Sequence, residues 1–277
     1  MVTTILAYFL VAILAGIIGS MLGLGGGIII VPALTLLFGV EIHTAVAASV
    51  VSVIATSMGA SLRYLKEGLI NTRVAMLLQV GATLGAVSGA VVEGLLDPHI
   101  LYLMFGGLMA YSAYSMYQAR RLELPQNVEP DAVSRRLALQ GSYYDQALGR
   151  VVDYQITRTL PGLAVMYLSG AISGLLGIGG GAFKVLAMDQ VMRMPIKVSS
   201  ATSAYMIGVT AAAGSIVYLL RGDVVPQIAG PVALGVLAGA MLGTLLMVRM
   251  RGSTLRKLFI PVLLVIAVQM LVKGVGG

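Results

Sequence analysis

The chain has 277 residues, of which 58% are hydrophobic and only 10% charged, and its mean hydropathy is +0.95. These values lie outside the range of soluble domains. The lack of cysteine excludes a disulfide framework and a thiolate metal site, and the two histidines, His43 and His99, are far apart in sequence. A net charge of +7 fits the basic loops of a membrane protein. We therefore expect no metal, cofactor or nucleic-acid partner.

Long apolar runs follow one another along the chain, most of them about 20 residues long, which is the length a helix needs to cross a bilayer. Period-two alternation is absent, so helices rather than strands satisfy the backbone in lipid. The first run lacks the basic segment that precedes a cleaved signal peptide. The composition thus predicts an all-α polytopic membrane protein. The runs cover residues 3–22, 43–62, 74–92, 100–119, 159–178, 198–220, 224–248 and 258–272.

An internal repeat appears when the chain is shifted by 154 residues. "GIIGSMLGLGGGIIIV" (16–31) then aligns with "GAISGLLGIGGGAFKV" (170–185), and the register holds without a gap through 104 positions, of which 26 are identical. We expect a first repeat over 1–119, a linker over 120–158 and a second repeat over 159–277. The matching glycine triplets Gly81, Gly85, Gly89 and Gly235, Gly239, Gly243 are small-xxx-small stripes that favour close helix packing.

Charge predicts that the two repeats have opposite topology in the membrane. If the 63–73 loop, the linker and the segments 193–197 and 249–257 are cytoplasmic, they hold 15 of the 18 lysines and arginines. The positive-inside rule then favours inverted repeats with both termini outside. Within the cytoplasmic linker, "GSYYDQALGRVVDYQIT" (141–157) has the pattern of a small β-hairpin around Gly149. A passive linker and a gating element both remain open.

Two glycine turns, Gly25–Gly27 and Gly179–Gly181, each precede a segment too short to span the bilayer. The glycines of these turns are Gly25, Gly26, Gly27, Gly179, Gly180 and Gly181. Both ends of each helix and short-helix unit must emerge on one side, so the glycine turn is expected inside the membrane. A broken helix there exposes backbone N–H groups and the positive end of a helix dipole, which attract anions. Such interrupted segments at matching positions of two halves indicate a transporter's substrate site, and packing devices are the alternative.

Polar side chains near these turns extend the predicted anion site. Lys184 lies nine residues before Arg193, about 13 Å along a helix, and an intramembrane cation is costly unless it faces a cavity or an anion. A local ion pair with Asp189 is the alternative. Hydroxyls of the following helices can donate to oxyanions, or else bond their own helix backbone or join helices. The candidates are Ser49, Ser52, Ser200, Thr202 and Ser203.

The sequence resembles the TauE/SafE sulfite exporter family of bacterial and archaeal anion permeases. The resemblance rests on "GLLGIGGGAFKV" (174–185), "GSMLGLGGGIIIVP" (19–32), "SSATS" (199–203) and "YYDQALGR" (143–150), and covers nearly the whole chain. It implies inverted repeats, a prokaryotic cell membrane, and transport of small sulfur-containing anions such as sulfite, sulfoacetate or other organosulfonates. Leu186 replaces the proline found as Pro32 after the first turn, which leaves the equality of the two turns open.

We therefore expect a secondary transporter, an exporter, that works by alternating access between the repeats. A passive anion channel using the same site is the alternative. An enzyme is disfavoured, because no Walker A lysine with its Ser or Thr, no G-x-S-x-G and no H-E-x-x-H occurs. Glu93 and Asp189 are candidates for a proton relay. Beyond the anion and the lipid bilayer, a homodimer is kept as a candidate assembly.

Overall fold

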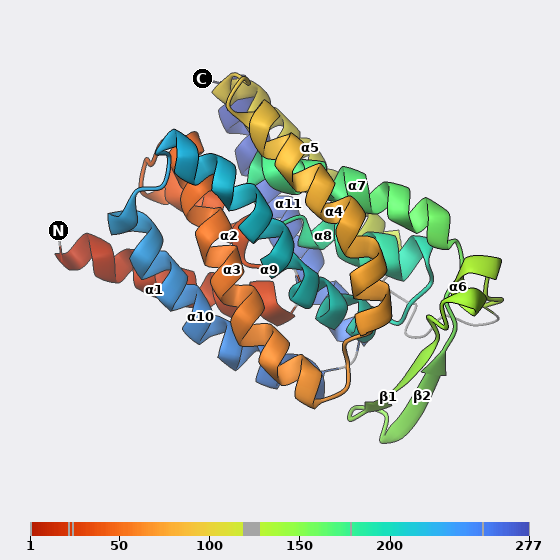
Figure 1. Cartoon of the computed structure of the whole chain (residues 1–277). Coiled ribbons are helices and arrows are strands. Elements are labelled where there is room, and N and C mark those ends of the chain that lie inside the picture. The colour runs from red at the N-terminus through yellow and green to blue at the C-terminus, as the bar shows by residue number, and fades with distance from the viewer. Residues whose placement is uncertain are drawn as a thin grey trace.

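The computed structural model describes residues 2–21, 23, 25–118, 128–177, 179–250 and 252–276 (Figure 1). This part of the chain is mainly helical, as the composition predicts. Five helices are long and apolar enough to cross a membrane, and shorter apolar helices accompany them. The five are α3 (Ile42–Lys66), α4 (Thr72–Glu93), α7 (Thr159–Leu176), α9 (Ile196–Arg221) and α10 (Pro226–Arg249).

The elements of the two halves correspond one to one under the shift of 154 residues. The short helices and the π-helical turns that follow them correspond residue for residue. The first half contains α1 (Val2–Met21), α2 (Gly27–Pro32), the π-turn η1 (Ala33–Leu37), α3, α4 and α5 (Pro98–Gln118). The second contains α7, α8 (Gly181–Leu186), the π-turn η2 (Ala187–Val191), α9, α10 and α11 (Gly252–Val275).

The halves are intertwined rather than placed side by side as separate bundles. Helix α1 packs against α10 of the other half, and α4 packs in the same way against α7. The equivalent helices α3 and α9 contact each other in the middle of the molecule, and α5 contacts its equivalent α11 (Figure 1). Most of the core is therefore formed between the repeats, not within them.

Glycine stripes make two of these contacts close. A Cβ atom at Gly239 would collide with the carbonyl oxygen of Ile13, and one at Gly85 with that of Tyr167. Without side chains at these positions, the backbones of α10 and α1, and of α4 and α7, approach directly. Because Ile13 and Tyr167 are themselves equivalent under the shift, the two contacts are the same contact made twice.

The polar linker forms a small hairpin that packs on one end of the bundle. Helix α6 (Ala132–Arg136) precedes the antiparallel strands β1 (Gly141–Asp145) and β2 (Arg150–Tyr154), with Gly149 in the left-handed conformation at the turn. The side-chain amide of Asn71 donates to the Leu139 carbonyl at 2.7 Å and to the Tyr154 hydroxyl at 2.9 Å. The hairpin is thus attached to the loop between α3 and α4.

Candidate functional site

The glycine turns interrupt the first helix of each half at equivalent places. Gly25 and Gly26 have φ values of 80° and 75°, and α2 begins at the next residue. Gly179 and Gly180 have φ values of 71° and 64°, and α8 begins directly after them. Two successive left-handed residues are strongly disfavoured for side chains other than glycine, which explains the residue type at these turns.

Both turns lie against the same two side chains at the contact of α3 with α9. A Cβ atom at Gly25 would lie 3.0 Å from Ile207 Cγ2 and 3.1 Å from Val53 Cγ1. At Gly179 the same two methyl groups would lie at 2.7 Å. Val53 and Ile207 are equivalent under the repeat, so the turns converge on one point that both halves build.

Two serines fix the turns across the repeats. Ser49 donates to the Gly177 carbonyl at 2.7 Å, and Ser203 donates to the Gly23 carbonyl at 2.8 Å. Each helix of the central pair therefore holds the glycine turn of the opposite half. Because a hydroxyl has one proton to donate, these two serines position the turns in this structure.

Two of the remaining predicted hydroxyls, those of Ser52 and Thr202, have partners within the protein. Ser52 donates to the Ser49 carbonyl at 2.7 Å, and Thr202 accepts from the backbone N–H of Asn71 at 3.1 Å. Ser200 is buried, and its backbone lies against Gly23. A direct role for these hydroxyls in ligand binding stays a prediction.

Lys184 is buried in the first turns of α8, close to the second glycine turn. Its ammonium donates to the Thr210 hydroxyl at 2.6 Å, and the same oxygen accepts from the Gln79 side chain at 3.0 Å. These hydroxyl and amide groups belong to α9 and α4, both of which are apolar helices.

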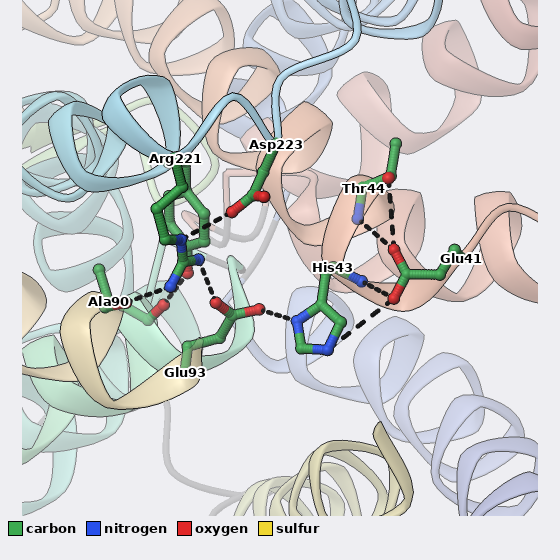
Figure 2. Close-up of polar contacts among 9 residues, drawn as sticks. Glu41, His43, Thr44, Ala90, Glu93, Arg221 and Asp223 are labelled. Atoms are coloured by element: carbon green, nitrogen blue, oxygen red, sulfur yellow. Dashed lines mark hydrogen bonds and ion pairs between the residues drawn. The ribbon is translucent and has the colours of Figure 1, made fainter. Parts of the chain in front are cut away.

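A second polar cluster, drawn in Figure 2, lies where α3 begins and α4 ends, whereas the loop joining these two helices contacts the hairpin segment at their opposite ends. Glu93, the last residue of α4, is fully buried and accepts from His43 Nδ1 at 2.7 Å and from the Arg221 guanidinium. Glu41 caps the N-terminus of α3, and its carboxylate lies 3.8 Å from His43 Nε2. Asp223 Oδ2 accepts from Arg221 Nε at 2.8 Å. The sequence indicated Glu93 alone, because its partners come from positions 50 and 128 residues away.

The hairpin end of the bundle carries a buried ion pair. Lys197 Nζ lies 2.8 Å from Asp145 Oδ1, and both side chains are almost fully buried. Burial raises the pKa of Asp145, but the hydrogen bond and charge of Lys197, with the backbone N–H groups of Leu148 and Ala147, bring the pKa below its ordinary value. The pair joins the linker to the start of α9.

Together these features define a polytopic helical membrane protein with a duplicated, intertwined core and polar groups at its centre and both ends. The family model for the sulfite exporter TauE/SafE matches residues 8–270. The chain belongs to this family of membrane transporters, in agreement with the resemblance drawn from its motifs.

Relatives from bacteria and archaea support the assignment over most of the chain. A probable membrane transporter protein, YunE of Bacillus subtilis, is 29% identical, covering 95% of this chain and 96% of its own. A probable membrane transporter protein of Xylella fastidiosa is 29% identical, covering 92% of each chain. MJ0441 of Methanocaldococcus jannaschii, also a probable membrane transporter protein, is 26% identical over 76% of this chain and 70% of its own. No solved structure matches the chain.

Proposed function

We propose that the protein is a secondary transporter that exports small sulfur-containing anions, such as sulfite or an organosulfonate, by alternating access between inverted repeats. The observation that carries the proposal is the buried Lys184 ammonium beside the second glycine turn, bonded to a neutral hydroxyl. A cation at such a place is costly unless an anion or water visits it. The family supports the transport role, and the lysine supports the charge of the cargo.

The directions of equivalent helices support the inverted arrangement. Gly106 of α5 lies against Leu271 of α11, and Gly274 lies against Leu103. The later residue of α5 thus lies against the earlier residue of α11, so the two helices run antiparallel. Equivalent helices with opposite directions are what an axis in the membrane plane would produce.

The contents of the two ends support one orientation in the cell membrane. The hairpin, the 63–73 loop and the start of α9 meet at one end, through contacts such as Arg73 with the Ala138 carbonyl and Lys197 with Asp145. The other end carries Glu41, Glu93 and Asp223. With 15 of 18 basic residues assigned to the hairpin side, the positive-inside rule makes that side cytoplasmic and the termini external.

The test is anion binding and flux with the Lys184→Met variant. Purified protein is screened by thermal shift against sulfite, sulfate, thiosulfate and simple sulfonates, and the best anion is followed into proteoliposomes. We expect a shift for at least one sulfur oxyanion and a loss of binding of tenfold or more, on the order of 1.4 kcal/mol, in Lys184→Met. Lys273→Met, at the end of α11, is the matched control and should bind normally. Unchanged affinity in Lys184→Met would remove the lysine from the site.

A passive channel with the same site predicts different kinetics. A carrier changes conformation in each cycle, so its flux should saturate with anion concentration at low turnover. A channel should give a current that follows voltage without such saturation. Recordings from planar bilayers and fluxes from proteoliposomes of one preparation distinguish the two.

A further inference from the structure

The cluster at the non-hairpin end contains a buried carboxylate held from two sides. Glu93 is 0% exposed, and its two oxygens face different partners: His43 at 2.7 Å and the Arg221 guanidinium (Figure 2). The His43 side chain is 26% exposed, so the imidazole connects the buried carboxylate with the surface. A proton from solvent can therefore reach the pair through His43.

A proton on His43 would change the balance of charge in the cluster. The cluster drawn in Figure 2 holds three carboxylates, those of Glu41, Glu93 and Asp223, and one permanent cation, Arg221, which pairs with Glu93 and Asp223. Protonated His43 supplies a second cation between Glu93 and Glu41, so its contact with Glu93 becomes an ion pair, whereas neutral His43 leaves a hydrogen bond without that positive charge. Histidine is the side chain that changes charge between pH 5 and 8. An opposite charge within hydrogen-bonding distance stabilises the charged forms of both partners.

The cluster also joins elements of both repeats. His43 is in the first turn of α3 and Glu93 is at the end of α4, while Arg221 ends α9 of the other half. The position equivalent to His43 is Lys197, whose permanent charge holds Asp145 of the hairpin at the opposite end. The two central helices thus each begin with a basic residue that binds a carboxylate, but only the first of these residues is a histidine, the residue type that can change charge near neutral pH.

We propose that the His43–Glu93 pair is a proton-binding site, and that proton binding there closes this end of the molecule. The imidazolium and Arg221 then hold Glu93 from α3 and α9 at once. Loss of the proton weakens the hold of α3 on α4 and favours opening. By linkage, opening of this end releases the proton. The use of that proton as the coupling ion rests on the proposed function, whereas the proton-linked closure does not.

The other charged or titratable groups near the pair are carboxylates and tyrosine, lysine and arginine side chains. Tyr218 lies under the Arg221 guanidinium at 5.0 Å, and Lys273 lies over the Tyr102 ring, itself near Glu41. Tyrosine, lysine and arginine keep their charge states between pH 5.5 and 8, and solvent-facing carboxylates stay ionised. His43 is thus the group of the cluster expected to change charge there.

The test measures access to a buried position behind the cluster as a function of pH. The chain has no cysteine, so Ser215→Cys, a near-isosteric change in α9 less than two turns before Arg221, gives one reporter thiol. Its maleimide labelling rate is divided by that of Leu95→Cys, an exposed position beyond Glu93, to remove the pH dependence of thiol chemistry. We expect the normalised rate to fall about fivefold from pH 8 to pH 5.5.

Two substitutions of His43 should mimic the unprotonated, open state and the protonated, closed state. His43→Gln removes the titratable group, so labelling should be fast and independent of pH. His43→Lys supplies the permanent cation found at the equivalent Lys197, so labelling should be slow at every pH. His99→Gln, which alters the other histidine, should keep the parent's pH response. These measurements need no substrate, so their outcome is separate from that of the transport assay.

Two results would overturn the proposal. A flat pH profile in the parent would show that the cluster is a permanent structural contact. An equal pH response in His43→Gln and His99→Gln would assign the response to another group. Should His43→Gln fail to fold, the slow, flat profile of His43→Lys against the pH-dependent parent still decides, because a response unrelated to His43 would persist in that variant.

Discussion

At the scale of single residues, the buried lysine is the sharpest departure from an apolar interior. Lys184 could face Asp189, five positions along the chain, or a ligand, and the sequence left both open. In the fold its ammonium donates to Thr210, a residue of α9, beside Gln79 of α4. A neutral partner satisfies one proton of the ammonium and none of its charge, which suits a site that an anion occupies for part of a cycle.

Thr210→Val measures how much the hydrogen bond between Lys184 and the Thr210 hydroxyl contributes to stability. The change keeps the shape but removes the acceptor of a buried charged donor, so we expect a loss of roughly 1–3 kcal/mol in stability. In the Lys184→Met background the same change should cost much less, because the ammonium is gone. Melting curves of the single and double variants measure the coupling, and additive effects would show that the contact contributes nothing.

At the scale of elements, the helix contacts made by the glycine stripes explain why matching triplets occur in both halves. Gly239 faces the Ile13 carbonyl of α1, whereas a Cβ atom added at Gly230, in the same helix, would have no neighbour within 4 Å. The two glycines of α10 thus differ in environment while sharing a helix, which gives a comparison with its own control.

Gly239→Ala should destabilise the fold, and Gly230→Ala should not. A methyl at Gly239 forces the backbones of α10 and α1 apart, at a cost of typically about 1–3 kcal/mol for overpacking. At Gly230 alanine meets no other helix and gains helix propensity, but the ring of the following Pro231 offsets part of that gain, so the net change in stability should be small. Thermal unfolding in detergent ranks the two variants, and equal melting temperatures would contradict the packing role of the stripe.

The docking of the hairpin should depend on the ion pair between Asp145 and Lys197. Lys197→Met leaves a buried carboxylate without its cation, which costs roughly 3–5 kcal/mol, so tryptic cleavage after Arg150 should accelerate. Arg73→Met, which removes an exposed contact to the Ala138 carbonyl, is the control and should have little effect. Unchanged cleavage in Lys197→Met would show that the hairpin docks without the pair.

Acid should release the same hairpin. The pKa of Asp145 lies below its ordinary 3.8, so the pair stabilises docking above that pH and is lost as pH falls through the lowered value. Peptic cleavage of residues 141–154 should therefore stay slow at pH 5 and rise only below about 3.8. A rise centred near pH 6 would point to another group.

At the scale of the whole molecule, the intertwined repeats connect the two ends to one centre. Helices α3 and α9 carry the serines that bind both glycine turns. Each helix also begins with a basic residue that binds a carboxylate: His43 binds Glu93 at one end of the molecule, and Lys197 binds Asp145 at the other. A relative movement of these two helices would alter both carboxylate contacts and the positions of the glycine turns together. That coupling is what alternating access requires.

Cysteine labelling in intact cells tests the proposed topology. Cysteines at Leu95 and Gly222 should react with an impermeant maleimide from outside, because both lie at the acidic end. Cysteines at Arg150 and Arg249 should react only after permeabilisation, since both are placed on the basic, cytoplasmic side. Labelling of Arg249→Cys from outside in intact cells would refute the inverted arrangement.

The sequence by itself determined the class of protein, the repeat and the elements. Composition and run length predict membrane helices because the bilayer imposes a length and a polarity. The 154-residue shift reproduces the bounds of both short helices, since a duplicated sequence repeats its local propensities. The glycine turns are readable for the same reason: left-handed backbone selects glycine locally.

The tertiary structure alone decided which partners meet. Ser49 binds a carbonyl of the opposite half, Lys184 binds Thr210, and Glu93 joins His43 and Arg221. These contacts join different helices, and their sequence separations range from 26 to 128 residues. Periodicity reports which face of a helix is apolar, but the choice of the facing helix follows from close packing of the whole bundle, where the glycine stripes admit one neighbour and exclude others.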